Sequence, residues 1–238
     1  MRQAITKDLF MTLTKYGLRE WGAGGALLFL LIAYGVFLIA EGNCVAGWII
    51  LVLALLALIA VVGFFRSPTR KIVSDPLALS SPADGTVKDI EVVDDFTQEP
   101  FTGKALRIGI FLSVFNVHVN RAPADWKVLT KIYRKGRYYD ARDSRCVREN
   151  EAMTLAGIGQ AGGLSFPLAV RQISGAIARR IVCPPSSGSE FAKGDIYGMI
   201  KFGSRTELYV PVDDRFEVAA KIGDKVKAGE TVLVRIKK

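Results

Sequence analysis

The chain has 238 residues, half of them hydrophobic, and its 32 Lys and Arg against 23 Asp and Glu give a net charge of +9. A chain of this length, if wholly outside a membrane, would form one or two modest domains. Its three cysteines, Cys44, Cys146 and Cys183, are odd in number and widely spaced, which argues against a disulfide framework and suits a reducing compartment. We interpret them as packing residues. Because the usual zinc-ligand spacings are absent, no metal site is expected.

Two long uncharged segments follow the N-terminal region. Twenty residues separate Glu20 from Glu41, and 24 separate Glu41 from Arg66. Since roughly 20 helical residues cross the hydrocarbon core of a bilayer, we predict a transmembrane helical hairpin over residues 21–65, after a basic segment of residues 1–20. A buried core hairpin is the alternative. A cleaved signal peptide fits poorly, because the first apolar run starts late and a second follows at once.

Basic residues flank the predicted hairpin on both sides and are absent from its loop. They are Arg2, Lys7, Lys15 and Arg19 before it, and Arg66, Arg70 and Lys71 after it. Lys and Arg favour the cytoplasmic side of a membrane. We therefore expect an inner-membrane protein with both termini in the cytoplasm and a cytoplasmic domain of residues 66–238.

From Arg66 onward the sequence changes to short β-branched runs separated by Gly, Pro and Asp. Five runs predict strands, over residues 86–93, 105–111, 176–182, 208–212 and 231–236. The best candidate for a short helix is residues 150–156. The domain is therefore predicted to be mainly β with few short helices.

Two stretches of this domain resemble the halves of a barrel-sandwich hybrid, the flattened β-fold of lipoyl and biotinyl carriers. They are Ser81–Val87 and Lys221–Leu233, and Gly223-Asp224 and Ala228-Gly229 mark tight turns within the second. No lysine stands in the Met-Lys-Met or Asp-Lys-Ala context of such carriers. The resemblance therefore concerns architecture and not function.

The step Gly203-Ser204-Arg205 is the first candidate site. A Ser hydroxyl that follows an unbranched Gly can reach back to the preceding carbonyl, which is the geometry that self-cleavage of a Gly-Ser bond requires. The alternative is an ordinary Gly-Ser turn in which Arg205 is a solvated charge.

His118 is the only histidine, and Asp84 lies in a Pro-Ala-Asp-Gly turn. Imidazole is the side chain best suited to proton transfer near neutral pH, and an aspartate can orient it in a Ser-His-Asp arrangement. The alternatives are a structural histidine and a turn-capping aspartate. A hydrolase that uses Ser204, His118 and Asp84 as a triad also stays open, although no Gly-x-Ser-x-Gly motif is present.

Several motifs follow one another along the predicted domain. They are Phe64-Phe-Arg-Ser-Pro-Thr-Arg70, Ser81-Pro-Ala-Asp-Gly85, Val117-His-Val-Asn-Arg121 with Pro123, Tyr133-x-x-Gly136 with Asn150-Glu151, Gln172-Ile-Ser-Gly-Ala-Ile-Ala-Arg-Arg-Ile181 and Tyr197-Gly-Met-Ile-Lys-Phe-Gly-Ser-Arg205. This ordered series resembles the phosphatidylserine decarboxylase family, and specifically its short membrane-anchored branch.

The resemblance implies a pyruvoyl cofactor made from the chain itself, with no pyridoxal phosphate and no metal. Ser204 would attack the carbonyl of Gly203, with His118 taking the hydroxyl proton and Asp84 orienting the histidine. Elimination and hydrolysis would convert Ser204 into the pyruvoyl group, which acts as an electron sink. The products would be a β chain, residues 1–203, and an α chain, residues 204–238. His118 would then also donate a proton to the carbanion left by decarboxylation.

The implied activity is conversion of phosphatidylserine to phosphatidylethanolamine, or the same chemistry on archaetidylserine. Eight Lys and Arg between Lys127 and Arg148 form a basic patch, which is expected to attract anionic lipid at about 1 kcal/mol per residue near the surface. Nucleic-acid binding would also explain the basic charge, but no recognition motif is present. A homo-oligomer is compatible with the sequence. The remaining alternative is a non-enzymatic, membrane-anchored hybrid-barrel binding module, which predicts an uncut chain.

Overall fold

The computed structural model describes residues 11–176, 180–201 and 203–237. The chain divides into two units, residues 1–69 and residues 70–238. Of the basic residues used above for the orientation, Arg2 and Lys7 lie outside the described residues.

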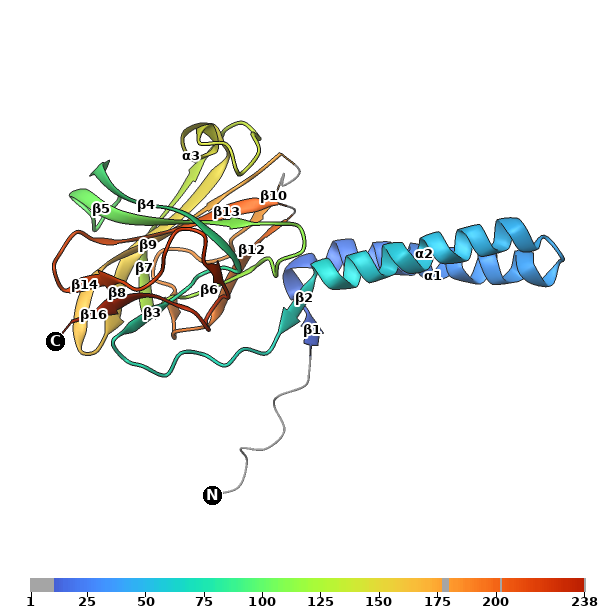
Figure 1. Cartoon of the computed structure of the whole chain (residues 1–238), viewed down its shortest axis with the longest axis horizontal. Coiled ribbons are helices and arrows are strands. Elements are labelled where there is room, and N and C mark those ends of the chain that lie inside the picture. The colour runs from blue at the N-terminus through green and yellow to red at the C-terminus, as the bar shows by residue number, and fades with distance from the viewer. Residues whose placement is uncertain (1–10, 177–179, 202, 238) are drawn as a thin grey trace, which may run out of the picture. The chain divides into compact units, whose positions relative to one another are not determined.

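The first unit is a pair of long apolar helices, α1 (Leu18–Ala40) and α2 (Cys44–Phe64) (Figure 1). The strand β1 (Met11–Leu13) and a turn of 3-10 helix (Lys15–Gly17) precede them, and β1 pairs antiparallel with β2 (Arg66–Pro68). The helices approach closely at two glycines: a Cβ added to Gly47 would lie 2.7 Å from the carbonyl oxygen of Gly35. Small residues at a helix crossing are typical of membrane helices.

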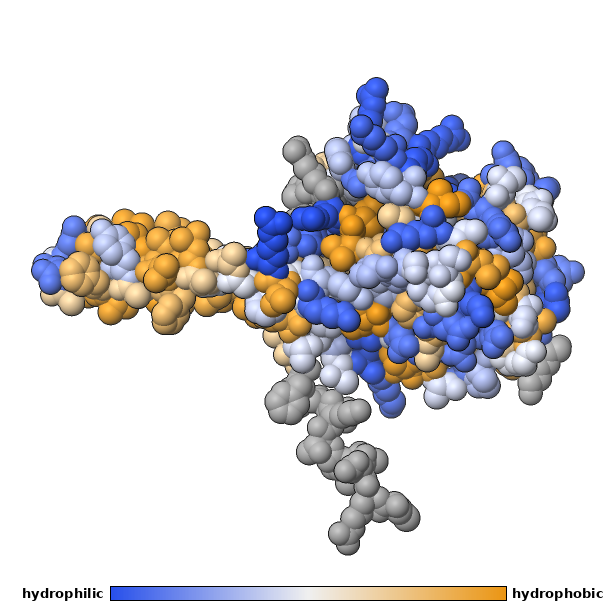
Figure 2. Space-filling model, turned by 180° about the vertical axis from the view of Figure 1, so that it is seen from behind, coloured by the Kyte–Doolittle hydropathy of each residue, from blue (hydrophilic) through white to orange (hydrophobic). Residues whose placement is uncertain are grey.

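The surface of this helix pair is apolar and exposed. Phe29, Val45 and Ile59 are 70%, 76% and 67% exposed, and Figure 2 shows the helices as a largely orange region. Both helices are long and apolar enough to cross a membrane. A buried core hairpin would instead have most of these side chains covered, so the exposed surface indicates membrane association.

The second unit is built on an antiparallel eight-stranded sheet. Its strands are, in sheet order, β11 (Glu190–Phe191), β7 (Asp125–Arg134), β8 (Ala152–Ala161), β9 (Leu164–Ile173), β13 (Ser204–Pro211), β5 (Gly103–Leu112), β4 (Gly85–Phe96) and β15 (Lys225–Val226). Two three-stranded sheets complete it: β10 (Arg180–Val182), β12 (Ile196–Lys201) and β6 (Val119–Arg121); and β14 (Phe216–Val218), β16 (Val232–Ile236) and β3 (Ala78–Ser80). The prediction of a mainly β domain is confirmed.

The predicted strands over residues 86–93, 105–111, 208–212 and 231–236 coincide largely with β4, β5, β13 and β16. Of the run over residues 176–182, β10 includes Arg180–Val182, and residues 177–179 lie outside the described residues. The two stretches that resemble halves of a hybrid barrel lie side by side. The Ser81 amide donates to the Thr231 carbonyl at 2.8 Å, and the Gly223 amide donates to the Val87 carbonyl at the same distance.

The helix predicted over residues 150–156 is wrong. A helix of five residues, α3 (Arg145–Glu149), ends just before this segment, and β8 begins at Ala152. β8 pairs along its length with both β7 and β9, so its backbone groups are satisfied by the sheet. Pairing on both sides outweighs the weak helical preference of the local sequence.

The packing interpretation fits two of the three cysteines. Cys146 and Cys183 are buried, whereas Cys44 is exposed on α2. Burial raises the pKa of the Cys146 thiol to about 11 and that of the Cys183 thiol to about 12. Both side chains are therefore protonated and poorly nucleophilic at neutral pH.

β13 is the strand that carries the candidate site, and it lies between β9 and β5 with almost every residue buried. Successive side chains on a strand point to opposite faces of the sheet. Ser204 therefore shares a face with Thr206 and Leu208, and Arg205 points to the opposite face with Glu207.

Candidate active site

Ser204 is the first residue of β13, opposite Leu112 of β5. Its side chain is fully buried, and its hydroxyl has no hydrogen-bond partner among the described residues. Gly203 before it has a φ of +54°, in the left-handed region that glycine adopts most readily. A buried hydroxyl without a partner costs stability, and in a native protein such a group calls for a functional explanation.

The carbonyl of Gly203 packs against the backbone of Gly175. A Cβ added to Gly175 would lie 2.2 Å from the Gly203 carbonyl oxygen and 3.1 Å from its carbonyl carbon. Only a residue without a side chain fits there. The bond that the sequence identifies as a cleavage site is therefore bordered by the segment that follows β9.

Asn150 holds this segment in place from a fully buried position. Its side-chain amide donates to the carbonyls of Ser174 and Tyr139, each at 2.8 Å, and its side-chain oxygen accepts from the Tyr139 amide at 2.8 Å. One side chain thus joins the segment beside Gly203 to the loop that begins at Tyr139. The sequence indicated Asn150 and Gly175 only as parts of motifs.

A small cavity of about 230 Å³ opens beside Gly203. It is lined mostly by apolar side chains and by two charged ones: Phe111, Ser113, Val114, Asp140, Ala141, Arg142, Ala176 and Gly203. The loop joined by Asn150 provides one wall, and Ala176 belongs to the segment that packs on the Gly203 carbonyl. The cavity therefore borders the residue that directly precedes Ser204.

His118 is fully buried, with its Nδ1 2.9 Å from the carbonyl oxygen of Asn116. A carbonyl only accepts hydrogen bonds, so Nδ1 carries the proton, and Nε2 of the neutral ring is the nitrogen that can accept one. The pairing of β6 with β12 extends to this residue, because the Ile200 amide donates to the His118 carbonyl at 3.2 Å.

A side-chain hydrogen bond joins β6 to β13 close to both candidate residues. Asn120 donates to the Thr206 hydroxyl at 3.1 Å. Ser204 comes two residues before Thr206 on β13, so alternation directs it to the same face as Thr206. His118 comes two residues before Asn120, directly before β6 begins.

Asp84 is buried and has two partners on other segments. Its carboxylate accepts from Arg70 at 2.7 Å and from the Ala228 amide at 2.8 Å. The aspartate thus ties the start of the domain to the turn before β16. The role of Asp84 in orienting His118, implied by the family resemblance, stays a prediction.

Comparison with known proteins decides the family. The family model described as phosphatidylserine decarboxylase matches residues 58–234. The chain belongs to the phosphatidylserine decarboxylase family. It is 43% identical over 195 residues to a phosphatidylserine decarboxylase proenzyme of Rhodopirellula baltica, covering 80% of this chain and 79% of that protein. A proenzyme of the same name from Trichlorobacter lovleyi is 42% identical over 214 residues, which cover 90% of this chain and 92% of that one.

On the opposite face of β13, this decarboxylase buries an ion-pair network around Arg205. The Arg205 side chain is 2.6 Å from Asp89 and 2.9 Å from Glu207, which also accepts from Tyr209. The guanidinium lies over Gly109, where an added Cβ would be 2.0 Å from it. Burial alone would lower the pKa of Arg205, but the hydrogen bond and charge of Asp89 and the charge of Glu207 outweigh burial and raise it.

The alternative that Arg205 is a solvated charge is therefore wrong, since the residue is 4% exposed. We expect Arg205→Met to lower the free energy of unfolding of the uncleaved chain by about 3 kcal/mol, because it leaves buried carboxylates less well paired. At roughly 2–4 °C per kcal/mol for a domain of this size, thermal melting in detergent would detect the loss.

Arg215→Met is the matched control for that measurement. Arg215 makes an ion pair with Asp213 at the same distance of 2.6 Å, but its side chain is 56% exposed against 5% for Arg205. Exposed pairs contribute little to stability, so its melting temperature should barely change. Equal melting temperatures for the two variants would contradict a stabilising role of the buried network.

Proposed function

We propose that this chain is a self-processing, pyruvoyl-dependent decarboxylase that converts phosphatidylserine to phosphatidylethanolamine. The observation that carries the proposal is the buried Ser204 hydroxyl, which has no hydrogen-bond partner among the described residues and follows a left-handed glycine. An ordinary serine hydrolase needs an accessible hydroxyl, and this one is fully buried. A hydroxyl that attacks its own chain needs no access to solvent.

The residues of the site suit such a self-cleavage. The Ser204 oxygen attacks the Gly203 carbonyl carbon, and His118 takes the hydroxyl proton on Nε2 while its Nδ1–H donates to the Asn116 carbonyl. The peptide C–N bond breaks to leave an ester and a free amine on residue 204. Elimination then releases the Gly203 carboxylate and leaves dehydroalanine, whose hydrolysis releases ammonia. The Asn120–Thr206 hydrogen bond supports this pairing of His118 with Ser204.

A pyruvoyl group fits the position of Ser204. Its carbonyl oxygens would occupy a buried place where the present hydroxyl oxygen lacks a partner among the described residues, and the cavity beside Gly203 gives a headgroup a route to it. When present, the group supplies a ketone that reacts with the substrate amine and accepts the electrons released with carbon dioxide. The chain's task is to hold residue 204, exclude water and supply a proton from His118.

The membrane part of the proposal concerns residues 1–65. Residues 21–65 would form a transmembrane hairpin after a basic segment, residues 1–20, with the domain of residues 66–238 on the cytoplasmic side of the inner membrane. The two exposed apolar helices and the basic flanks support this arrangement. A lipid substrate would then reach the enzyme within the same membrane. Archaetidylserine is the alternative substrate, because its headgroup is the same.

Intact-mass spectrometry of the purified, detergent-solubilised protein tests the proposal. We expect two chains, residues 1–203 and residues 204–238. The smaller chain should be lighter by one ammonia than a serine-initiated fragment, as conversion of the serine into a pyruvoyl group requires. A single uncut chain of 26.0 kDa would overturn the proposal and favour the non-enzymatic module.

A further inference from the structure

Residues 140–145, which run from the loop after β7 to the first residue of α3, hold two copies of one ion-pair arrangement. In each, an aspartate accepts from the backbone amide and the side chain of the arginine two residues later. Asp140 pairs with Arg142 at 2.7 Å, and Asp143 pairs with Arg145 at 2.6 Å. The two arginine side chains are similarly exposed, at 67% and 58%. The two arginines differ in the cavities that they line.

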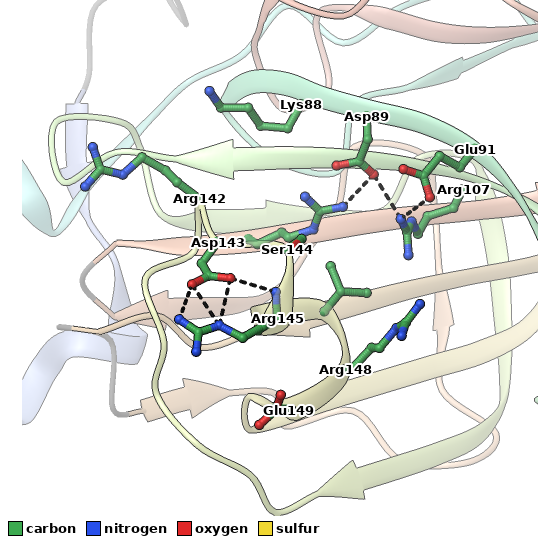
Figure 3. A pocket seen from close by; sticks show the side chains of 12 residues that line it. Lys88, Asp89, Glu91, Arg107, Arg142, Asp143, Ser144, Arg145, Arg148 and Glu149 are labelled. Atoms are coloured by element: carbon green, nitrogen blue, oxygen red, sulfur yellow. Dashed lines mark hydrogen bonds and ion pairs between the residues drawn. The ribbon is translucent and has the colours of Figure 1, made fainter.

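Arg142 lines the small cavity beside Gly203, whereas Arg145 does not. Both arginines also line a larger recess of about 550 Å³ (Figure 3). In that figure Arg142 points away from the Asp143–Arg145 pair. The larger recess includes Arg205, which belongs to the face of β13 opposite Ser204, and its ion-pair partner Asp89 on β4. A substrate headgroup that must reach residue 204 therefore meets Arg142 and not Arg145.

The guanidinium of Arg142 is held by one edge. Nε and Nη2 donate to the two oxygens of Asp140, at 3.0 and 2.7 Å, and hydrogen bonds from the Arg142 side chain and backbone lower the pKa of the Asp140 carboxyl to about 2. Asp140 thus stays ionised and orients the arginine. Nη1 has no hydrogen-bond partner among the described residues, and a planar guanidinium offers its second edge to a phosphate.

We infer that Arg142 binds the phosphodiester of the substrate headgroup at the mouth of the cavity beside Gly203. The inference rests on the proposed function, because it takes residue 204 as the reacting centre. The serine amine must reach that residue, and the phosphate is separated from the amine by the two carbons of the headgroup. Among the described residues that line the cavity, Arg142 is the one cation.

The test compares R142M with R145M in detergent micelles. We expect R142M to raise KM for phosphatidylserine roughly ten- to a hundredfold, as loss of a hydrogen bond to a charged group implies, and R145M to leave it unchanged. R142K keeps the positive charge but loses the planar guanidinium, so its KM should lie between those of R142M and the unmodified chain. Glycerophosphoethanolamine has the phosphodiester but no carboxylate, so its inhibition constant should rise in R142M by a similar factor.

Three kinetic results would overturn the inference. They are an unchanged KM in R142M, an unchanged inhibition constant for glycerophosphoethanolamine, which would assign Arg142 to the carboxylate, and an equal effect of R145M. Intact mass separates this inference from the proposed function: R142M should cleave itself as fully as the unmodified chain. Loss of cleavage in R142M alone would also overturn the inference, because it would place Arg142 in the processing reaction, whereas loss of cleavage in every variant and in the unmodified chain would refute the proposed function.

Discussion

The Ser204→Ala chain is expected to remain a single polypeptide of 26.0 kDa and to release no carbon dioxide from phosphatidylserine. The substitution removes the only atom that can attack the Gly203 carbonyl in the proposed reaction. It should not harm the fold. The lost hydroxyl is buried without a partner among the described residues, and removing such a group avoids a desolvation cost of about 1–3 kcal/mol. Intact mass, a melting curve and trapping of labelled carbon dioxide measure the three effects.

The chain contains its own control for this experiment, a second Gly-Ser step at Gly188-Ser189. Gly188 also has a positive φ, of +87°, but the Ser189 hydroxyl accepts from the Ser186 amide at 3.1 Å. The same dipeptide thus stands in a turn with its hydroxyl satisfied. Ser189→Ala should be cleaved and active like the unmodified chain. Cleavage of Ser204→Ala between residues 203 and 204, or failure of Ser189→Ala to cleave, would contradict the assignment.

The features that could be predicted from sequence are those that depend on neighbouring residues. The lengths of the uncharged segments predicted α1 and α2, and the β-branched runs predicted β4 and β5. The Gly203-Ser204 step could be identified because the two residues are adjacent.

The features that could not be predicted depend on partners distant in sequence. Arg205 looked like a solvated charge because its partner Asp89 is 116 residues away. The bond of Asp84 to Arg70 could not be predicted because nothing local in the sequence indicates it. Residues 150–156 looked helical because pairing with β7 and β9 is invisible in a local window.

Gly175→Ala is expected to slow self-cleavage by about a hundredfold, the loss that a displacement of about 1 Å from a reactive geometry can cause. The new Cβ would lie 2.2 Å from the Gly203 carbonyl oxygen and 3.3 Å from the Ala141 Cβ. The carbonyl must therefore move, and it is the group that Ser204 attacks. Cell-free synthesis followed by gel or mass analysis over time would measure the cleavage rate.

Gly157→Ala separates this effect from general damage to the fold. Its Cβ would lie 2.0 Å from the Lys127 carbonyl oxygen, an equally severe clash with backbone, but within the pairing of β7 and β8. That variant should melt at a lower temperature and, where folded, cleave at the normal rate. Gly175→Ala should show the reverse pattern of slow cleavage with a smaller loss of stability, because the segment it displaces ends a strand. If both variants slow cleavage in proportion to their loss of stability, then Gly175 matters for folding and not for the geometry of the scissile bond.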